Sequence, residues 1–129
     1  MDFAKVDTIS AAEKGFDYTF IDPRTGEDTD AVFSLYGVGS RAYKQGQAKI
    51  DAYRSLQEKR GKKVDDEDLE LLHAELLAKC TRGWKNVEID GKKIEFSPEN
   101  AIDLYSKYPV VSSQIISEVF NVIDKLDKN

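Results

Sequence analysis

The residues that could carry out chemistry are few. The 129-residue chain has one histidine, His73, and one cysteine, Cys80. On a single helix these two residues lie about 10 Å apart along the axis, which is too far for both to bind one metal ion. A lone cysteine also cannot form an intrachain disulfide bond. We therefore expect neither a metal site nor a histidine-based catalytic relay, and interpret His73 as packed in or beside the core.

The densest group of carboxylates, Asp65–Asp68, lies at the start of a predicted helix. Contiguous side chains fan around a helix axis and do not converge on one point. The central glycine and closing glutamate of a calcium loop are missing, so we interpret these acids as complementing the positive end of the helix dipole. Neither a nucleophile elbow nor a phosphate-binding glycine loop followed by lysine is present. The sequence predicts a protein that is not an enzyme and holds no cofactor.

Composition limits the class of protein further. At 14.6 kDa, with 40% hydrophobic and 33% charged residues, residues 1–129 fit a single compact domain; whether residues 1–14 are ordered is left open. The net charge of -5 opposes nonspecific binding to nucleic acid. No apolar run approaches the roughly 20 residues of a membrane span, and the first residues lack a secretion-signal layout. We expect a cytosolic protein that contacts neither membrane nor nucleic acid.

Periodicity predicts a mainly α fold with small antiparallel β hairpins (α+β). A first hairpin is expected over residues 15–37, and a second one after Trp84, which we interpret as a structural anchor. In the second hairpin, a four-residue loop would pair Ile89 with Ile94; we prefer it to a two-residue loop, which would place Ile89 opposite Lys92.

Capping signals locate the predicted helices. They are a short helix near Ser10–Glu13 that ends before Gly15, a helix from the N-cap Ser40 to about Arg60, one from Asp65–Asp68 to Cys80, one that begins at Ser97-Pro98 and ends at Tyr108-Pro109, and a last one that reaches Leu126.

The two central helices differ sharply in charge. Residues 41–63 contain eight bases and two acids, whereas residues 64–79 contain six acids and one base. The pattern is compatible with neighbouring helices that complement each other, with solvated faces, with a docking surface for a protein, or with nucleic-acid binding. For partner contacts we select Arg41, Lys44, Lys49, Tyr53, Arg54, Lys59 and Arg60.

The last predicted helix carries a wide apolar stripe. Such a stripe docks on the core of its own domain or on another chain. We predict a homo-oligomer formed through Ile115, Ile116, Val119, Phe120 and Ile123.

The order of several short motifs resembles a known family. Gly15 and an alternating strand precede Asp22-Pro23-Arg24-Thr25-Gly26-Glu27, Gly39-Ser40 opens a polar helix, and Cys80-Thr81-Arg82-Gly83-Trp84, Phe96-Ser97-Pro98-Glu99-Asn100-Ala101, Tyr108-Pro109 and Ser113-Gln114-Ile115 follow. This order over residues 11–123 resembles the tail assembly chaperones of long-tailed, lambda-like bacteriophages. Gly39 departs from the acid expected before Ser40.

The resemblance implies a non-enzymatic protein of the host cell cytoplasm. Such a chaperone binds the tape measure protein, promotes assembly of the tail tube protein around it, and is absent from the virion. Two alternatives remain open: a structural head-tail connector or tail completion protein, and a small nucleic-acid-binding regulator that acts through residues 41–63.

Overall fold

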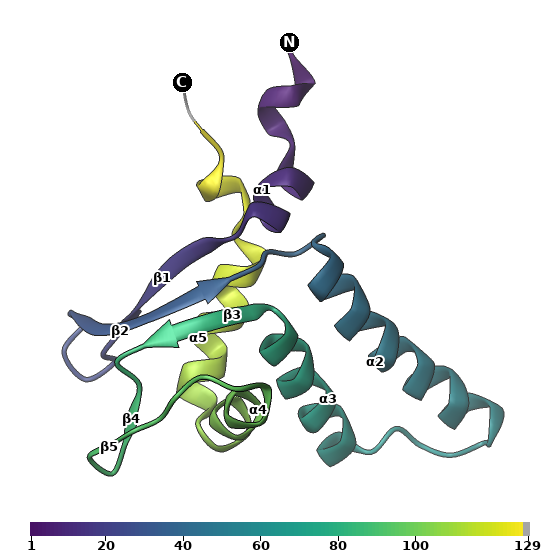
Figure 1. Ribbon diagram of the computed structural model, residues 1–129. Helices are drawn as coiled ribbons and strands as arrows, with labels where there is room; N and C mark the ends of the chain where they lie inside the picture. The colour runs from purple at the N-terminus through teal and green to yellow at the C-terminus, as the bar shows by residue number, and fades with distance from the viewer. Residues whose placement is uncertain (128–129) are drawn as a thin grey trace.

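The computed structural model describes residues 1–127 and is mainly helical. Its elements are η1 (Phe3–Val6), α1 (Thr8–Lys14), β1 (Phe16–Ile21), β2 (Asp28–Leu35), α2 (Arg41–Lys59), α3 (Asp66–Lys79), β3 (Thr81–Lys85), β4 (Glu88–Ile89), β5 (Lys92–Lys93), α4 (Pro98–Lys107), α5 (Pro109–Phe120) and η2 (Ile123–Lys125), where η marks a 3-10 helix (Figure 1). Two small antiparallel sheets accompany the helices. The predicted α+β fold is confirmed.

The first sheet has three strands in the order β1-β2-β3. Phe33 at its centre lies opposite Tyr18 of β1 and Trp84 of β3. The sequence predicts only the first two strands, because β3 has weak alternation and is defined by its pairing with β2. The third strand matters for stability, since an isolated two-stranded hairpin is marginal in water.

Trp84 is the structural anchor that its position predicts. Its indole nitrogen donates a hydrogen bond to the carbonyl oxygen of Ile94 at 2.8 Å. Its ring also packs edge-on against Phe33 and Phe96. Trp84 thereby joins the three-stranded sheet to the second hairpin.

The predicted register of the second hairpin is wrong. Ile89 pairs with Lys92 and Glu88 pairs with Lys93, which leaves a two-residue loop of Asp90 and Gly91. Both loop residues have positive φ, 52° and 75°, as the tightest hairpin turns require. The turn chemistry therefore outweighs the preference for pairing Ile89 with Ile94.

Most predicted helix starts are confirmed, but two boundaries are wrong. Ser40 and Ser97 cap α2 and α4, with each hydroxyl accepting a backbone hydrogen bond. At the N-terminus, however, Asp7 is the cap because its carboxylate accepts from the Ser10 amide at 2.9 Å, so α1 begins earlier than the Ser10 capping box predicts. The last α-helix ends at Phe120 instead of reaching Leu126.

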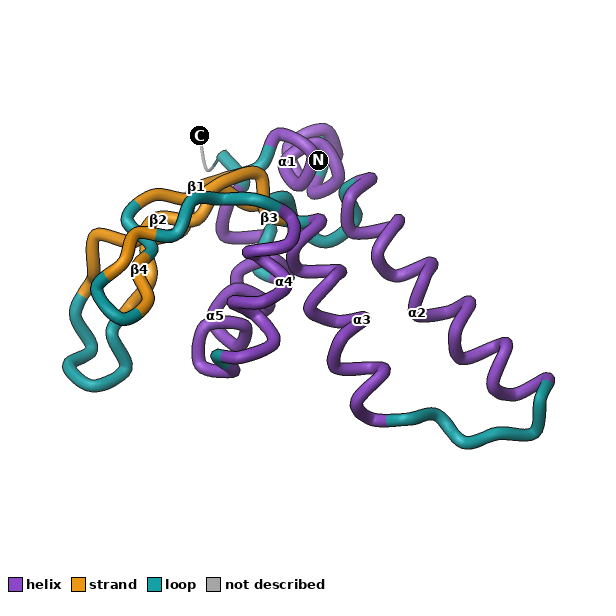
Figure 2. Tube along the Cα trace, turned by 60° about the horizontal axis from the view of Figure 1, so that its bottom comes forward, coloured by secondary structure: helices purple, strands orange, loops and turns teal. Residues whose placement is uncertain are grey.

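The core lies between the three-stranded sheet and helices α3, α4 and α5. Leu35 of the sheet, Ile50 of α2 and Ile115 of α5 are at most 1% exposed. Helix α2 packs along α3 and forms one edge of the molecule (Figures 1 and 2). This placement leaves much of its surface free.

Candidate partner-binding surface

The basic residues of α2 lie on an exposed helix, as the partner-binding prediction requires. Ser40 caps the start of this helix. The side of the helix that packs against α3 is a narrow stripe that contains Gly46, Ile50 and Tyr53. All six predicted basic contact residues are exposed: Arg41, Lys44, Lys49, Arg54, Lys59 and Arg60. Within the described residues, no ion pair joins α2 to α3. The basic side chains of α2 are therefore not neutralised by ion pairs with the acidic side chains of α3.

These basic residues do not share one face. An α-helix turns about 100° per residue, so Lys49 and Arg54 lie roughly 140° apart around the axis. By the same geometry, Lys44 and Lys59 point away from the α3 side. The outward face, defined here by Arg41, Lys44 and Lys59, is therefore the part of α2 most accessible to another protein.

Tyr53 has a role within the domain. Its hydroxyl donates to the Asp68 carboxylate at 2.8 Å and accepts from the backbone amide of Asp65 at 3.0 Å. The side chain is half-buried. Tyr53 thus links α2 to the start of α3, and its hydroxyl is already used inside the chain.

The residues predicted for self-association separate into two groups. Ile115 and Val119 are 0% exposed and belong to the core, so neither touches a second copy of the folded domain. Ile116 is half-buried, whereas Phe120 and Ile123 are 50% and 64% exposed. Most of the apolar stripe on this helix is therefore buried within the domain itself, where the sheet and α3 cover it.

The exposed part of that stripe lies near the N-terminal segment. The amide of Gly37 donates to the carbonyl of Ala12 in α1, and the amide of Val38 donates to the carbonyl of Val119 in α5. The N-terminal segment and the described residues that follow α5 therefore lie at the same end of the molecule (Figures 1 and 2). The large exposed apolar residues of these segments are Met1, Phe3, Val6, Ile9, Phe120 and Ile123.

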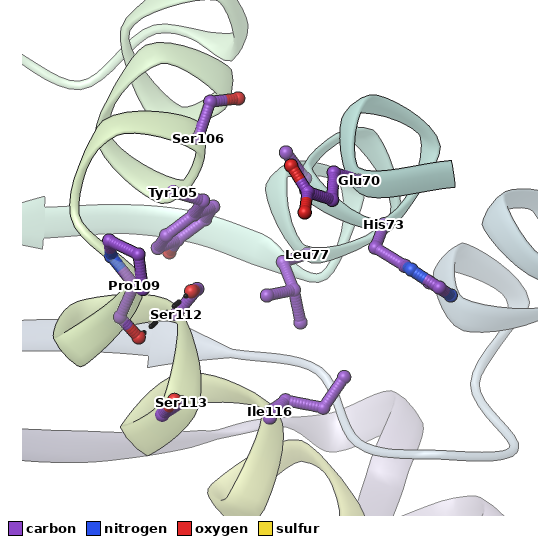
Figure 3. A pocket seen from close by; sticks show the side chains of 10 residues that line it. Glu70, His73, Leu77, Tyr105, Ser106, Pro109, Ser112, Ser113 and Ile116 are labelled. Atoms are coloured by element: carbon purple, nitrogen blue, oxygen red, sulfur yellow. Dashed lines mark hydrogen bonds between the residues drawn. The ribbon is translucent and has the colours of Figure 1, made fainter. Parts of the chain in front are cut away.

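A cavity of about 400 Å³ lies between α3, α4 and α5 (Figure 3). Leu77, Tyr105 and Ile116 provide apolar lining, and Glu70 and His73 are exposed at its margin. Burial raises the pKa of Tyr105, whose hydroxyl lies 2.7 Å from that of Thr81. The phenol thus stays neutral. His73 lies beside the core, and its ring points away from the cavity in Figure 3.

Cys80 is fully buried, and burial raises the pKa of its thiol to about 12. A thiol needs its ionised form to act as a nucleophile, so Cys80 is a structural residue. Among residues 1–127, no group of three or more His, Cys, Asp or Glu side chains is arranged to hold a metal ion. A helix capable of spanning a membrane is likewise absent from residues 1–127.

Comparison with known proteins places the chain among phage-derived proteins. The model of the YdaY prophage protein family matches residues 38–124, about two thirds of the sequence, and the chain belongs to this family. The match begins just before α2 and includes α3, the second hairpin, α4 and α5. No curated protein and no solved structure matches the chain.

Proposed function

We propose that this prophage protein is a tail assembly chaperone that binds the tape measure protein in the host cytoplasm, promotes tail tube assembly, and is not retained in the virion. The phage origin and the motif order from Gly15 to Ile115 support the proposal. The structural observation that carries it is the exposed basic helix α2 at the edge of the molecule (Figure 2).

Helix α2 suits a long helical partner. Its 19 residues correspond to a length of roughly 28 Å. Between the bases of the outward face lie small exposed residues, Ala48, Ala52 and Ser55, which let another backbone approach. Apolar and charged contacts along a groove or ridge are a recurrent way to recognise an amphipathic helix.

The charge of α2 favours a partner segment with acidic residues. Complementary charges at the rim of an interface increase the association rate and define the register of the two chains. Such contacts are screened by salt over about 8 Å at physiological ionic strength. Binding through α2 should therefore weaken as salt is raised.

The first test is capture of the tape measure protein. The tagged chain is expressed during prophage induction, and co-purifying proteins are identified by mass spectrometry. A Lys44→Glu/Lys59→Glu variant should recover about tenfold less tape measure protein, equivalent to roughly 1.4 kcal/mol. The control is Lys92→Glu/Lys93→Glu, which makes the same change in charge on exposed β5.

Purified virions give the second half of the test. The chaperone role requires that the chain be absent from them. Retention in virions, together with capture of capsid or connector proteins, would transfer the assignment to a head-tail connector or tail completion protein. DNA binding at about 50 mM salt that is lost on reversing the α2 charges would instead favour the nucleic-acid-binding regulator.

A further inference from the structure

The α2–α3 hairpin has a second exposed side, turned away from α5. On α2, the ring contact between Tyr43 and Phe120 marks the flank nearest α5. Helical geometry places Lys49 and Leu56 on the opposite flank, and Arg60, the C-cap residue, follows on the same side. We call this side, together with the adjoining surface of α3, the open hairpin face.

The α3 part of the open hairpin face is acidic. Glu70 and Leu77 line the cavity shared with α4 and α5. By the same helical spacing, Leu71 and Glu75 lie roughly 100° and 140° around the axis from Glu70, on the side turned away from this cavity. Basic and acidic residues therefore lie side by side on one surface.

Exposed leucines lie among these charges. Leu56 is 43% exposed and Leu71 is 48% exposed. Within the described residues, both leucines are far more exposed than the leucines of the core. Covering them would remove apolar surface from water, which favours association.

We propose that the open hairpin face binds a second copy of this chain. In this arrangement a two-fold axis runs parallel to the helices, between the two hairpins. Each basic α2 then lies across the acidic α3 of the other copy, and the four helices form an antiparallel bundle. The interface is isologous, as in most homodimers.

The levels of the residues along the hairpin agree with this pairing. Tyr53 bonds to Asp68, and Gly46 lies against Leu76, which fixes how α2 and α3 run past each other. Lys49 and Glu75 are consequently within about 4 Å of the same level along the axes. A two-fold axis parallel to the helices preserves these levels, so Lys49 of one copy faces Glu75 of the other.

Charge also selects between the possible two-fold axes. An axis across the helices would place α2 on α2 and α3 on α3, which juxtaposes like charges and costs free energy. The axis along the helices instead places the basic α2 of each copy against the acidic α3 of the other, so that the favourable contact occurs twice. The outward face of α2, with Lys44 and Lys59, remains open in this dimer, so the inference does not depend on the proposed chaperone role.

The test measures the mass of the full chain in solution across micromolar concentrations by light scattering and sedimentation equilibrium. The wild-type chain should form a dimer whose dissociation constant rises with salt. Lys49→Glu alone and Glu75→Lys alone should each raise that constant at least tenfold. The double variant Lys49→Glu/Glu75→Lys should restore it to within about threefold of the wild type, because the swapped pair is again complementary.

Further variants keep the test decisive. Glu75 is half-buried; if Glu75→Lys lowers the melting temperature, the variants Lys49→Glu and Leu71→Asp at exposed positions carry the test. Leu71→Asp should also give a monomer, whereas Lys93→Glu should not. A monomer at every concentration overturns the proposal. So does a dimer that survives Lys49→Glu and Leu71→Asp but dissociates with Ile123→Asp, a result that assigns the contact to the apolar chain ends.

Discussion

Gly46 determines how closely α2 approaches α3. A Cβ atom at this position would lie 2.8 Å from Cγ and 2.9 Å from Cα of Leu76. The second contact is with backbone, which does not move without shifting α3. The sequence places Gly46 on the buried stripe of its helix, but only the packing shows that a hydrogen atom is required there.

We predict that Gly46→Ala destabilises the domain. Alanine favours a helix over glycine by up to about 1 kcal/mol, but the clash with Leu76 should outweigh this gain and lower the free energy of unfolding by roughly 1–3 kcal/mol. Urea denaturation measures the change. The neighbouring exposed variant Gln45→Ala should stay within about 0.5 kcal/mol of the wild type. A Gly46→Ala protein as stable as the wild type would show that α3 adjusts at little cost.

At the scale of elements, Gln114 attaches α5 to the edge strand β1. Its amide nitrogen donates to the Ile21 carbonyl at 2.7 Å, while its amide oxygen accepts from the Ile21 backbone at 3.0 Å and from the Tyr18 hydroxyl at 2.6 Å. One side chain thus takes the place of a neighbouring strand at Ile21. The sequence presents Gln114 only as part of a motif, because its partners lie more than ninety residues away.

Loss of this attachment should be measurable. Gln114→Ala removes the three hydrogen bonds and should lower the free energy of unfolding by about 1–3 kcal/mol. Hydrogen exchange at the Ile21 amide should accelerate, since its acceptor is gone. Ser117→Ala, at an exposed position on the same helix, is the matched control. Unchanged exchange at Ile21 in the Gln114→Ala protein would contradict this role.

At the scale of the whole molecule, two buried acidic protons link stability to alkaline pH. The pKa of Cys80 is raised to about 12 and that of Tyr105 is also raised, both chiefly by burial. In an unfolded chain a thiol ionises near pH 8.5 and a phenol near pH 10. The unfolded state therefore holds fewer protons than the folded state above about pH 8.5, and stability falls as the pH rises.

The measurement is the urea midpoint between pH 7 and pH 10. Stability should be flat with respect to these two groups at neutral pH and decline above about pH 8.5, where Cys80 contributes first. Cys80→Ala should remove the first part of this decline, whatever its effect on the midpoint at pH 7. The native thiol should also resist alkylation at pH 8 until the domain is unfolded. Rapid alkylation of the native protein would contradict the assignment.

The sequence by itself determined the features that depend on neighbours along the chain. Ser40, Ser97 and Pro98 start helices because a cap or a fixed φ acts within one turn. Alternation over residues 16–20 and 31–36 gave the first hairpin, and the charge difference between residues 41–63 and 64–79 is visible without a structure. The α+β class follows from these local signals.

Only the tertiary structure decided which surfaces are free. It paired β3 with β2, and it divided the apolar stripe into the buried Ile115 and Val119 and the exposed Phe120 and Ile123. Each outcome depends on contacts between segments distant in the chain, and hydrophobic burial and strand pairing of that kind leave no signal within a single turn or strand.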